Sequence, residues 1–412
     1  MSTDPVVIIG AGHGGVQCAA SLREEKYAGP IVLVCDEPRW PYQRPPLSKA
    51  YLKGTATRDS LALRGPAYFA EQTIDTRFGD RALRIDRAAR TAHLASGHVQ
   101  PYAHLVLATG ARARPAPFVG TDLEGVFALR NLDDADRLRD RFHEAKNIVV
   151  VGAGFIGLEF AATAALSGKP VTVIEAAPRV MGRAVSPPLS RFFADAHQAF
   201  GATLLTHTLV SGLEGSGGRV TGVILGDGTK LPADLVVVGI GVLAEDALAH
   251  DCGLECRDGI TVDDRMRTSD PNISAIGDCA NFPSLWAGGM ARLESVQNAT
   301  DQARVVAKRL AGGDMTYAAL PWFWSDQGDL KLQIAGLLRD ADLFVMRGDP
   351  ATRAFSIFAF AGATLRAVES VNRGGEHMAA RRIIAENLVL TAEQAADTGF
   401  DLKALAMGRT PA

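Results

Sequence analysis

The sequence lacks most features of secreted, metal-binding and membrane proteins. Its five cysteines, Cys18, Cys35, Cys252, Cys256 and Cys279, form no C-x-x-C pair, and their odd number and dispersal predict reduced thiols in a cytoplasmic protein. The nearest pair, Cys252 and Cys256, is followed by no second cysteine or histidine pair of zinc type, so we expect no bound metal. No apolar segment approaches the length of a membrane span, and the first residues lack the cationic region of a signal peptide.

Excess charge of either sign is also missing. Lysine and arginine number 43 and aspartate and glutamate 46, which gives a formal net charge of −3. This balance predicts neither a nucleic-acid partner nor an anionic membrane partner. At 412 residues the chain is long enough for two or three domains, and nothing in the sequence decides its oligomeric state.

Two complete glycine fingerprints of the form G-x-G-x-x-G are present. The first uses Gly10, Gly12 and Gly15, and the second uses Gly152, Gly154 and Gly157, with Phe155 and Ile156 between its last two glycines. In such a motif the first glycine makes a tight turn, the second admits a pyrophosphate, and the third lets the helix pack on its strand. Because each motif follows a short β-branched run, the pair predicts two bound dinucleotides.

An acidic residue follows the next apolar run after each fingerprint. Residues 31–34 lead to Asp36, and residues 171–174 lead to Glu175. A carboxylate at this place accepts the ribose hydroxyls of an adenosine and repels the 2′-phosphate of NADPH. Glu175 therefore predicts a preference for NADH, although Arg179 and Arg183 leave some tolerance of NADPH open.

The fold class predicted is α/β, with two Rossmann-like dinucleotide-binding domains and a C-terminal α+β domain. The run 104–110 reads as a strand that ends in a turn at Thr109-Gly110, and it matches a second run, 234–241, that ends in glycines including Gly241. The strand at 273–276, which stops at Gly277-Asp278, returns the chain to the first domain. We expect one nucleotide-binding domain from 1–112 and 244–320, a second from 113–243, and the third from 321–412.

Several short motifs together carry a resemblance to a known family. They are Arg44-Pro45-Pro46-Leu47-Ser48-Lys49, Leu158-Glu159, Arg267-Thr268-Ser269-Asp270-Pro271, Ile276-Gly277-Asp278, Glu294-Ser295-Val296-Gln297-Asn298-Ala299 and Trp322-Phe323-Trp324-Ser325-Asp326-Gln327. With the two fingerprints, they make the chain resemble the flavin-dependent ferredoxin reductases of oxygenase systems over nearly its whole length. The resemblance implies a glutathione-reductase type of fold, with FAD at the first fingerprint, NADH at the second and a [2Fe-2S] ferredoxin as acceptor.

The resemblance also implies a set of site residues. For FAD it implies Gly10, Gly12, Gly15, Asp36 on the ribose, Arg44 near the pyrophosphate and adenine, Lys49 by flavin N5, Thr109, Gly110, Asp278 on the ribityl chain, Val296 on the pyrimidine edge and Trp324 beside the ring. For the nicotinamide dinucleotide it implies Gly152, Gly154, Phe155, Ile156, Gly157, Glu159, Glu175, Arg183 and Gly241. Lys49 and Glu159 are the expected catalytic pair, joined across the domain interface. The chain departs from the family at Ala244-Glu245, where a Pro-Asn pair is usual.

The expected chemistry needs position and electrostatics rather than a nucleophile. A flavin takes a hydride from NADH and releases electrons singly, and the ammonium of Lys49 would stabilise the negative charge of the reduced ring. A disulfide reductase is excluded because residues 42–52 contain no cysteine. A rubredoxin reductase, a flavin NADH oxidase and a slow redox-sensing binding protein stay open. Arg304, Lys308 and Arg309 are candidates for an acceptor-docking face, or a merely solvated helix face.

Overall fold

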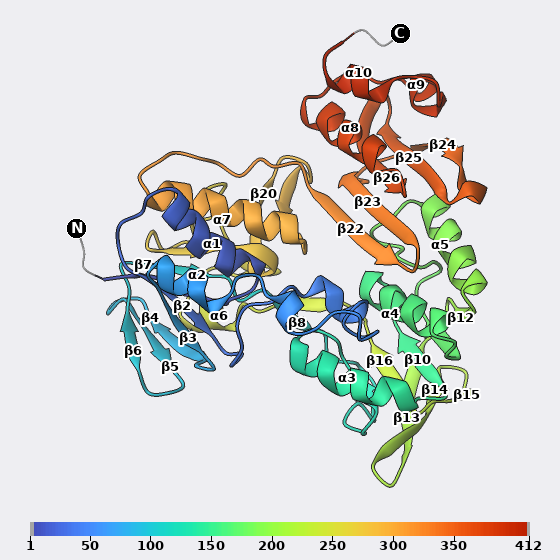
Figure 1. Ribbon diagram of the computed structural model, residues 1–412, viewed down its shortest axis with the longest axis horizontal. Helices are drawn as coiled ribbons and strands as arrows, with labels where there is room; N and C mark the ends of the chain where they lie inside the picture. Colours follow the sequence, from blue (N-terminus) through green and yellow to red (C-terminus); the bar gives the residue numbers. More distant parts are fainter. Residues whose placement is uncertain (1–3, 410–412) are drawn as a thin grey trace. The chain divides into compact units, whose positions relative to one another are not determined.

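The structure, a computed structural model, describes residues 4–409 and divides into two compact units (Figure 1). The first unit extends to residue 43 and includes 58–112 and 242–321. The second contains 44–57, 113–241 and the chain from 322 onward. The short segment 44–57 thus groups with the second unit, and so does the chain from 322 onward. The boundaries of these two units differ from those of the three domains expected from the sequence, and that three-domain division stays a prediction.

A parallel five-stranded sheet forms the centre of the first unit. Its order is β19-β7-β1-β2-β3, with bounds Ile273–Ala275, His104–Leu107, Val6–Ile9, Ile31–Cys35 and Ile74–Phe78. Val6 lies opposite both Ile31 and His104, so β1 is hydrogen-bonded on both sides. The β-branched and leucine residues of β1, β2 and β7 are almost all buried, as continuous apolar runs in a central parallel sheet should be.

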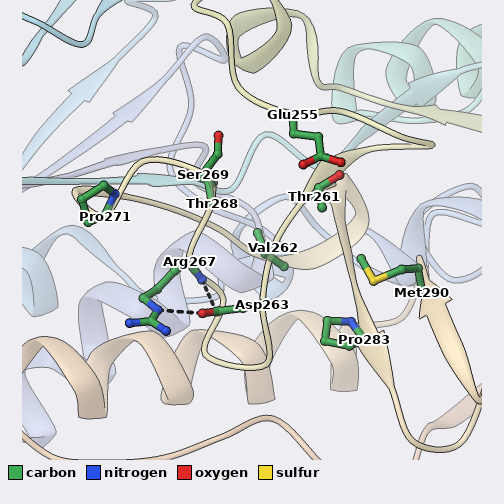
Figure 2. Close-up of a pocket in the computed structure, with 10 residues that line it drawn as sticks. All are labelled: Glu255, Thr261, Val262, Asp263, Arg267, Thr268, Ser269, Pro271, Pro283 and Met290. Atoms are coloured by element: carbon green, nitrogen blue, oxygen red, sulfur yellow. Dashed lines mark hydrogen bonds and ion pairs between the residues drawn. The ribbon is translucent and has the colours of Figure 1, made fainter.

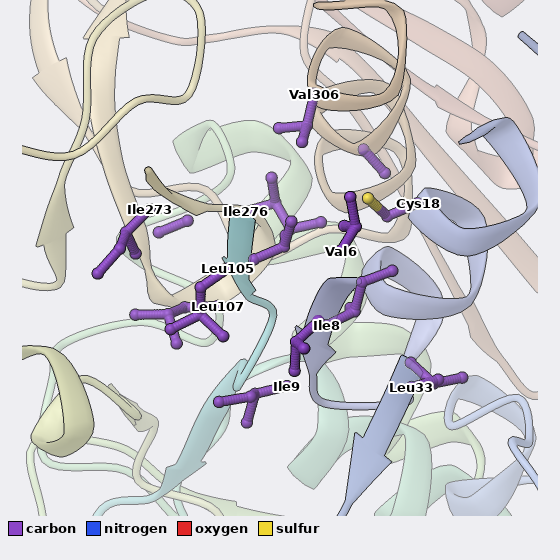
Figure 3. Packing of buried hydrophobic residues seen from close by; sticks show 14 of the residues in the cluster. Val6, Ile8, Ile9, Cys18, Leu33, Leu105, Leu107, Ile273, Ile276 and Val306 are labelled. Carbon is purple, nitrogen blue, oxygen red and sulfur yellow. The ribbon is translucent and has the colours of Figure 1, made fainter. Parts of the chain in front are cut away.

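Two helices pack against each other beside this sheet. α1 (His13–Glu24) leaves the first fingerprint, and α7 (Val296–Leu310) begins after Ser295, whose side chain accepts a hydrogen bond from the Asn298 N–H. Figure 3 shows the core between them and the sheet, where Cys18 and Val306 face Val6 and Ile276. This packing fixes the direction of α1 relative to the strand that precedes it.

The remaining elements of the first unit are short. They are η2 (Asp59–Leu61), α2 (Pro66–Glu71), β4 (Ala82–Asp86), β5 (Thr91–Leu94), β6 (Val99–Pro101), β17 (Val242–Ala244), α6 (Ala247–Asp251), β18 (Ile260–Thr261), η3 (Gly277–Cys279), β20 (Ala280–Ser284) and β21 (Gly289–Ala291). Strand β8 (Ala111–Ala113) ends where the chain enters the second unit.

The second unit repeats the parallel sheet. Its order is β12-β11-β10-β16-β9, with bounds Ala202–Leu205, Val171–Ile174, Ile148–Val151, Leu235–Val238 and Val126–Phe127. The helices of this part are α3 (Leu132–Glu144), α4 (Phe155–Leu166) and α5 (Pro187–Ala199), and η1 (Pro45–Ser48) lies against α4. A small antiparallel sheet of β13 (Val210–Ser216), β14 (Arg219–Leu225) and β15 (Lys230–Pro232) completes it.

An antiparallel sheet with helices forms the C-terminal part of the second unit, in agreement with the α+β fold expected there. Its order is β22 (Trp322–Gln327), β23 (Leu330–Gly336), β26 (Thr364–Val371), β25 (Ala354–Ala361) and β24 (Leu343–Asp349). The helical elements are η4 (Pro350–Thr352), α8 (Gly374–Ala385), α9 (Ala392–Ala396) and α10 (Leu402–Ala406). The sequence does not predict β26, which lies between β23 and β25 in the sheet.

Candidate functional site

The first glycine loop is shaped by close backbone approaches. Gly10 has φ +108°, and a Cβ there would lie 2.2 Å from the carbonyl oxygen of Ala108. A Cβ at Gly15 would lie only 1.8 Å from the carbonyl oxygen of Gly10. Both positions therefore require glycine. Gly10 makes the tight turn after β1, and Gly15 lets α1 pack closely on that strand.

The second glycine loop repeats this geometry. Gly152 has φ +105° and its Cβ would lie 2.4 Å from the Gly239 carbonyl oxygen, while a Cβ at Gly157 would lie 2.2 Å from the Gly152 oxygen. The backbone hydrogen bonds correspond as well, since the Gly10 N–H donates to the Val34 carbonyl at 2.8 Å and Gly152 to that of Ile174 at 2.7 Å.

The middle glycines show that both loops fit a dinucleotide. A Cβ at Gly12 or Gly154 would meet nothing within 4 Å, so the space above each loop is open. These glycines are the N-caps of α1 and α4, offer no side-chain acceptor, and are followed by no acidic residue in the first helical turn. Each helix thus presents its positive end and its first amide groups to an anion, as a bound pyrophosphate requires.

The acidic positions differ between the two loops. The Glu175 carboxylate follows β11 directly and accepts the Ala153 N–H at 2.7 Å and the Ala177 N–H at 2.8 Å. The residue at the same register in the first unit is Cys35, the last residue of β2. Asp36 comes one position later and is exposed. Asp36 is therefore not the register equivalent of Glu175, and its ribose contact stays a prediction.

The other FAD residues expected in the first unit lie at strand and helix ends. The Thr109 hydroxyl donates to the Glu245 carbonyl at 2.5 Å, and Gly110, with φ +74°, accepts the Glu245 N–H at 2.9 Å. Asp278 lies in η3, and Val296 is the first residue of α7. The turn at Glu245 is thus held by the two residues before β8, despite its unusual sequence.

The expected FAD residues Arg44, Lys49 and Trp324 belong to the second unit. The Arg44 guanidinium donates to the Arg130 carbonyl at 2.8 Å, and the Trp324 ring lies 5.6 Å from that of Trp322. For the nicotinamide dinucleotide, the Arg183 guanidinium approaches Gly241, since a Cβ there would lie 3.6 Å from it. The rings of Phe155 and Phe323 are tilted by 44° with their centroids 4.5 Å apart, and Ile156 is exposed at the start of α4.

Lys49 and Glu159 form an ion pair of 2.9 Å between Lys49 Nζ and Glu159 Oε1. The Glu159 side chain is buried, and that of Lys49 is 19% exposed, so the lysine is not freely solvated. The prolines at the start of η1 set the helical turn that brings Ser48 and Lys49 to α4, where the Thr163 hydroxyl donates to the Ser48 carbonyl at 3.1 Å. The pair lies within one compact unit of the structure, and its expected place at a domain interface stays a prediction.

Two serines complete this polar cluster and were not assigned a role from the sequence. Ser48 Oγ donates to Glu159 Oε2 at 2.6 Å, and Ser325 Oγ donates to Oε1 at 2.8 Å. Both carboxylate oxygens therefore accept hydrogen bonds, which offsets the free-energy cost of burying the charge of Glu159. Their presence in the quoted Arg44–Lys49 and Trp322–Gln327 motifs was the available signal.

The cysteines show no redox or metal arrangement. Burial raises the pKa of Cys35 to about 11 and that of Cys18 to about 12, so these thiols stay protonated. Within residues 4–409, all five cysteines are free thiols and no group of histidine, cysteine and acidic residues could hold a metal. In the same part of the chain, no helix combines the length and apolarity needed to cross a bilayer.

The basic residues of α7 do not form a shared solvated face. Arg309 is half-buried and donates to Ser274 Oγ, while Lys308 pairs with Glu25 at 2.7 Å and Arg304 with Asp301 at 2.5 Å. Arg309 therefore supports the fold of the first unit, while the half-exposed Arg304 and Lys308 stay candidates for the docking face.

An open cleft of about 470 Å³ lies on the first unit (Figure 2). Its lining includes Glu255, Thr261, Met290 and the Asp263–Arg267 pair, in which Arg267 Nε donates to Asp263 Oδ2 at 2.7 Å. None of the expected cofactor-binding residues lines it, so it is not part of either dinucleotide site.

Comparison with known proteins identifies the class. Residues 4–303 match the family described as pyridine nucleotide-disulphide oxidoreductase, and residues 322–406 match the reductase C-terminal family. The chain belongs to the pyridine nucleotide-disulphide oxidoreductase family. It is an oxidoreductase that uses FAD and a nicotinamide dinucleotide, and the expected fold class and cofactors are confirmed.

Ferredoxin reductases match this chain over nearly the whole length of both proteins. The chain is 49% identical to rhodocoxin reductase of Rhodococcus erythropolis, covering 98% of this chain and 94% of the relative. It is 40% identical to putidaredoxin reductase of Pseudomonas putida, covering 98% and 96%. The crystal structure of the ferredoxin reductase for the CYP199A2 system from Rhodopseudomonas palustris has a TM-score of 0.96 and 51% identity, covering 98% of this chain and 100% of that one. The resemblance read from the motifs is confirmed.

Proposed function

We propose that this protein is an NADH-dependent ferredoxin reductase, which passes electrons through FAD to a [2Fe-2S] ferredoxin serving a P450 or Rieske-type oxygenase. The observation that carries the proposal is the full-length likeness to ferredoxin reductases, including the C-terminal part. One similar structure, with a TM-score of 0.95 and 40% identity over 99% of both chains, is a covalent complex of putidaredoxin reductase with putidaredoxin.

The two glycine loops supply the binding geometry that this function needs. We assign FAD to the first loop and NADH to the second, because Glu175 offers both carboxylate oxygens beside the second loop. Each oxygen already accepts one backbone N–H and keeps a second lone pair for a ribose hydroxyl. A 2′-phosphate at that place would meet the same negative charge.

FAD, when bound, supplies a hydride acceptor that also gives up electrons singly. The chain's own part is electrostatic. The Lys49 ammonium is held by Glu159 and would stabilise negative charge at the reacting ring, with Trp324 as a wall of the site. Gly10, Gly12 and Gly15 would hold the pyrophosphate, with Asp36 and Asp278 toward the sugar and ribityl hydroxyls.

A reductase for rubredoxin is the second candidate. It is supported by 39% identity to the rubredoxin-NAD(+) reductase of Pseudomonas putida, over 89% of this chain and 95% of the relative. The nucleotide loops serve either acceptor equally, so the acceptor has to be tested directly. A flavin NADH oxidase or a slow redox-sensing protein would show itself by weak transfer to both iron proteins.

The test is steady-state turnover with NADH and with NADPH, run anaerobically with a [2Fe-2S] ferredoxin or a rubredoxin as acceptor and separately in aerated buffer with oxygen as the acceptor. We expect the highest kcat/KM with NADH and the ferredoxin. Faster reduction of rubredoxin would favour the second candidate, and electron transfer to oxygen alone would overturn the proposal.

We also infer a cytoplasmic location, which the five free thiols support. Cell fractionation with antibody detection would test it, and recovery of the protein outside the cytoplasm with oxidised cysteines would contradict it.

A further inference from the structure

Strand β22 presents two different faces. On one face, Phe323 contacts Phe155 of α4 at 4.5 Å between ring centroids, and Ser325 and Gln327 follow at the alternate positions of the strand. On the other face, Trp322 and Trp324 pair with each other. The strand that offers Trp324 to the expected flavin site therefore also directs polar groups to the nicotinamide-binding part of the same unit.

A chain of hydrogen bonds runs along the face that carries Ser325 and Gln327. His197 Nε2 and Gln327 Oε1 are 2.8 Å apart, Gln327 Nε2 donates to Ser325 Oγ at 3.2 Å, and Ser325 Oγ donates to Glu159 Oε1 at 2.8 Å. Because the amide oxygen of Gln327 only accepts, His197 Nε2 carries the hydrogen in this bond. Every donor in the chain thus points toward the carboxylate of Glu159.

The chain is sealed from water. Ser325, Gln327 and His197 are all fully buried, and Glu159 is 6% exposed. Burial lowers the pKa of His197, so the imidazole is neutral and acts as a donor rather than as a charge. In such a setting, a hydrogen bond to an ionised group is stronger than one between neutral groups, and its loss leaves the carboxylate undersatisfied.

We propose that Ser325 and Gln327 are positioning residues for the Lys49–Glu159 pair, supplied by the C-terminal part of the protein. This inference rests on the proposed function of Lys49 at the flavin. Ser325 and Ser48 take up part of the charge of Glu159, so the carboxylate neutralises the Lys49 ammonium only in part. Without Ser325, Oε1 keeps Lys49 as its remaining donor in the cluster, and the positive field that the ammonium offers to a reduced ring becomes weaker.

The test is the midpoint potential of bound FAD, measured by spectroelectrochemistry in a double-mutant cycle. We expect Ser325→Ala to lower the potential by about 30 mV, which is a tenfold change in the equilibrium of a two-electron couple. The same substitution in a Glu159→Gln background should cause no further shift, because its effect passes through the carboxylate. Gln327→Met should shift the potential in the same direction by a smaller amount.

Ser356→Ala is the matched control. Ser356 is a fully buried serine of the same sheet, but its hydroxyl bonds to Ser370 and Glu376 rather than to Glu159. We expect it to leave the potential unchanged. Equal shifts for Ser325→Ala with and without Glu159, or equal shifts for the two serine variants, would show a merely structural role and overturn the inference.

The outcomes separate this inference from the proposed function. If the wild-type protein binds no FAD, the proposed function fails. If FAD binds and NADH reduces it but Ser325→Ala and Gln327→Met leave the potential unchanged, only the positioning role fails. If Ser325→Ala does not retain FAD, Gln327→Met carries the comparison, since it keeps the Ser325 hydroxyl in place.

Discussion

The two parallel sheets are the same scaffold built twice from different sequence. The strand before the glycine loop pairs with a parallel strand on each side, β1 with β2 and β7, and β10 with β11 and β16. The first and third glycines of the two loops make the same close approaches to backbone oxygens. The fifth strand differs in origin, because β19 comes late in its unit whereas β9 precedes the rest of its sheet. Loop geometry is thus independent of how the chain closes the sheet.

The difference between the sites lies at the end of the second strand. Glu175 fills that place in the second unit with an anion tied to two backbone N–H groups, whereas Cys35 fills it in the first with a neutral thiol. We therefore expect the shared scaffold to hold the phosphates in both sites, and the residue at this position to distinguish how the two sugars are bound. This contrast leads to four predictions.

The largest effect is expected from the third glycines. Gly15→Ala and Gly157→Ala each place a Cβ within 2.2 Å or less of a backbone oxygen, an overlap that should cost more than about 3 kcal/mol and weaken binding by over about 100-fold. We expect Gly15→Ala to lose FAD, and Gly157→Ala to keep FAD but lose reduction by NADH. FAD content and anaerobic bleaching measure the two effects.

Gly65→Ala is the control for this pair. Its φ is −80° and a Cβ there would meet nothing within 4 Å, so it should leave both cofactors bound. Loss of FAD from Gly157→Ala at undiminished stability would reverse the assignment of the two loops.

The next prediction contrasts buried ionisable groups. Glu369 of β26 accepts the Ser186 N–H at 2.8 Å and the Ser186 hydroxyl, yet burial raises its pKa to about 7, with Arg179 opposing the shift. Below about pH 4.5 the carboxyl is protonated in both folded and unfolded chains. As the pH rises to about 7 only the unfolded chain ionises, so the free energy of unfolding should fall by about 3 kcal/mol.

Urea unfolding between pH 4.5 and 8 tests this, and Glu369→Gln should remove that part of the pH dependence. His104 in the first unit gives the opposite sign, because burial, and next Arg309, lower its pKa to about 3. Its contribution is present above about pH 6.5 and is lost as the pH falls. An unchanged pH profile in Glu369→Gln would contradict the assignment of the titration to this carboxyl.

A smaller effect is expected at Glu175. Glu175→Arg removes the repulsion of a 2′-phosphate and adds an attraction, so the ratio of kcat/KM for NADH to that for NADPH should fall by about 30-fold, or about 2 kcal/mol. Asp36→Ala is the control, since it should leave this ratio unchanged. A ratio that stays constant in Glu175→Arg would show that the carboxylate does not select the nucleotide.

The smallest effect is expected at Cys35, the register equivalent of Glu175. Cys35→Ala removes a buried neutral thiol, so it should cost about 1 kcal/mol in the free energy of unfolding and change FAD affinity less than about threefold. Fluorescence titration of the apoprotein with FAD measures the affinity. Loss of FAD binding would mean that the thiol, and not Asp36, supports the adenosine.

The sequence predicted what depends on local pattern. The β-branched runs and glycine spacing located β1, β2, β10 and β11 because buried parallel strands and tight turns impose strong local requirements. It did not identify β26, whose alternation of polar and apolar residues is interrupted by the fully buried Glu369 and Ser370. Their burial depends on tertiary partners such as Ser186, which local pattern does not reveal.

The candidate site was predicted in part for the same reason. Lys49 and Glu159 came from a family resemblance, and their 2.9 Å contact is a tertiary fact. Asp36 lies one residue beyond the position that matches Glu175, which counting from the glycines does not reveal because it does not show where a strand ends, and its ribose contact stays a prediction. The serines that complete the Glu159 cluster required the packing of η1 and β22 on α4 to be recognised.

The central claim is that the two glycine loops of one chain hold FAD and NADH together. Its most direct test is an anaerobic titration of the purified protein with NADH, followed by visible absorbance and by assay of the flavin released on heating. The account predicts about one FAD per chain, bleached by about one equivalent of NADH. A colourless protein that FAD does not reconstitute, or a bound flavin that NADH leaves oxidised, would contradict it.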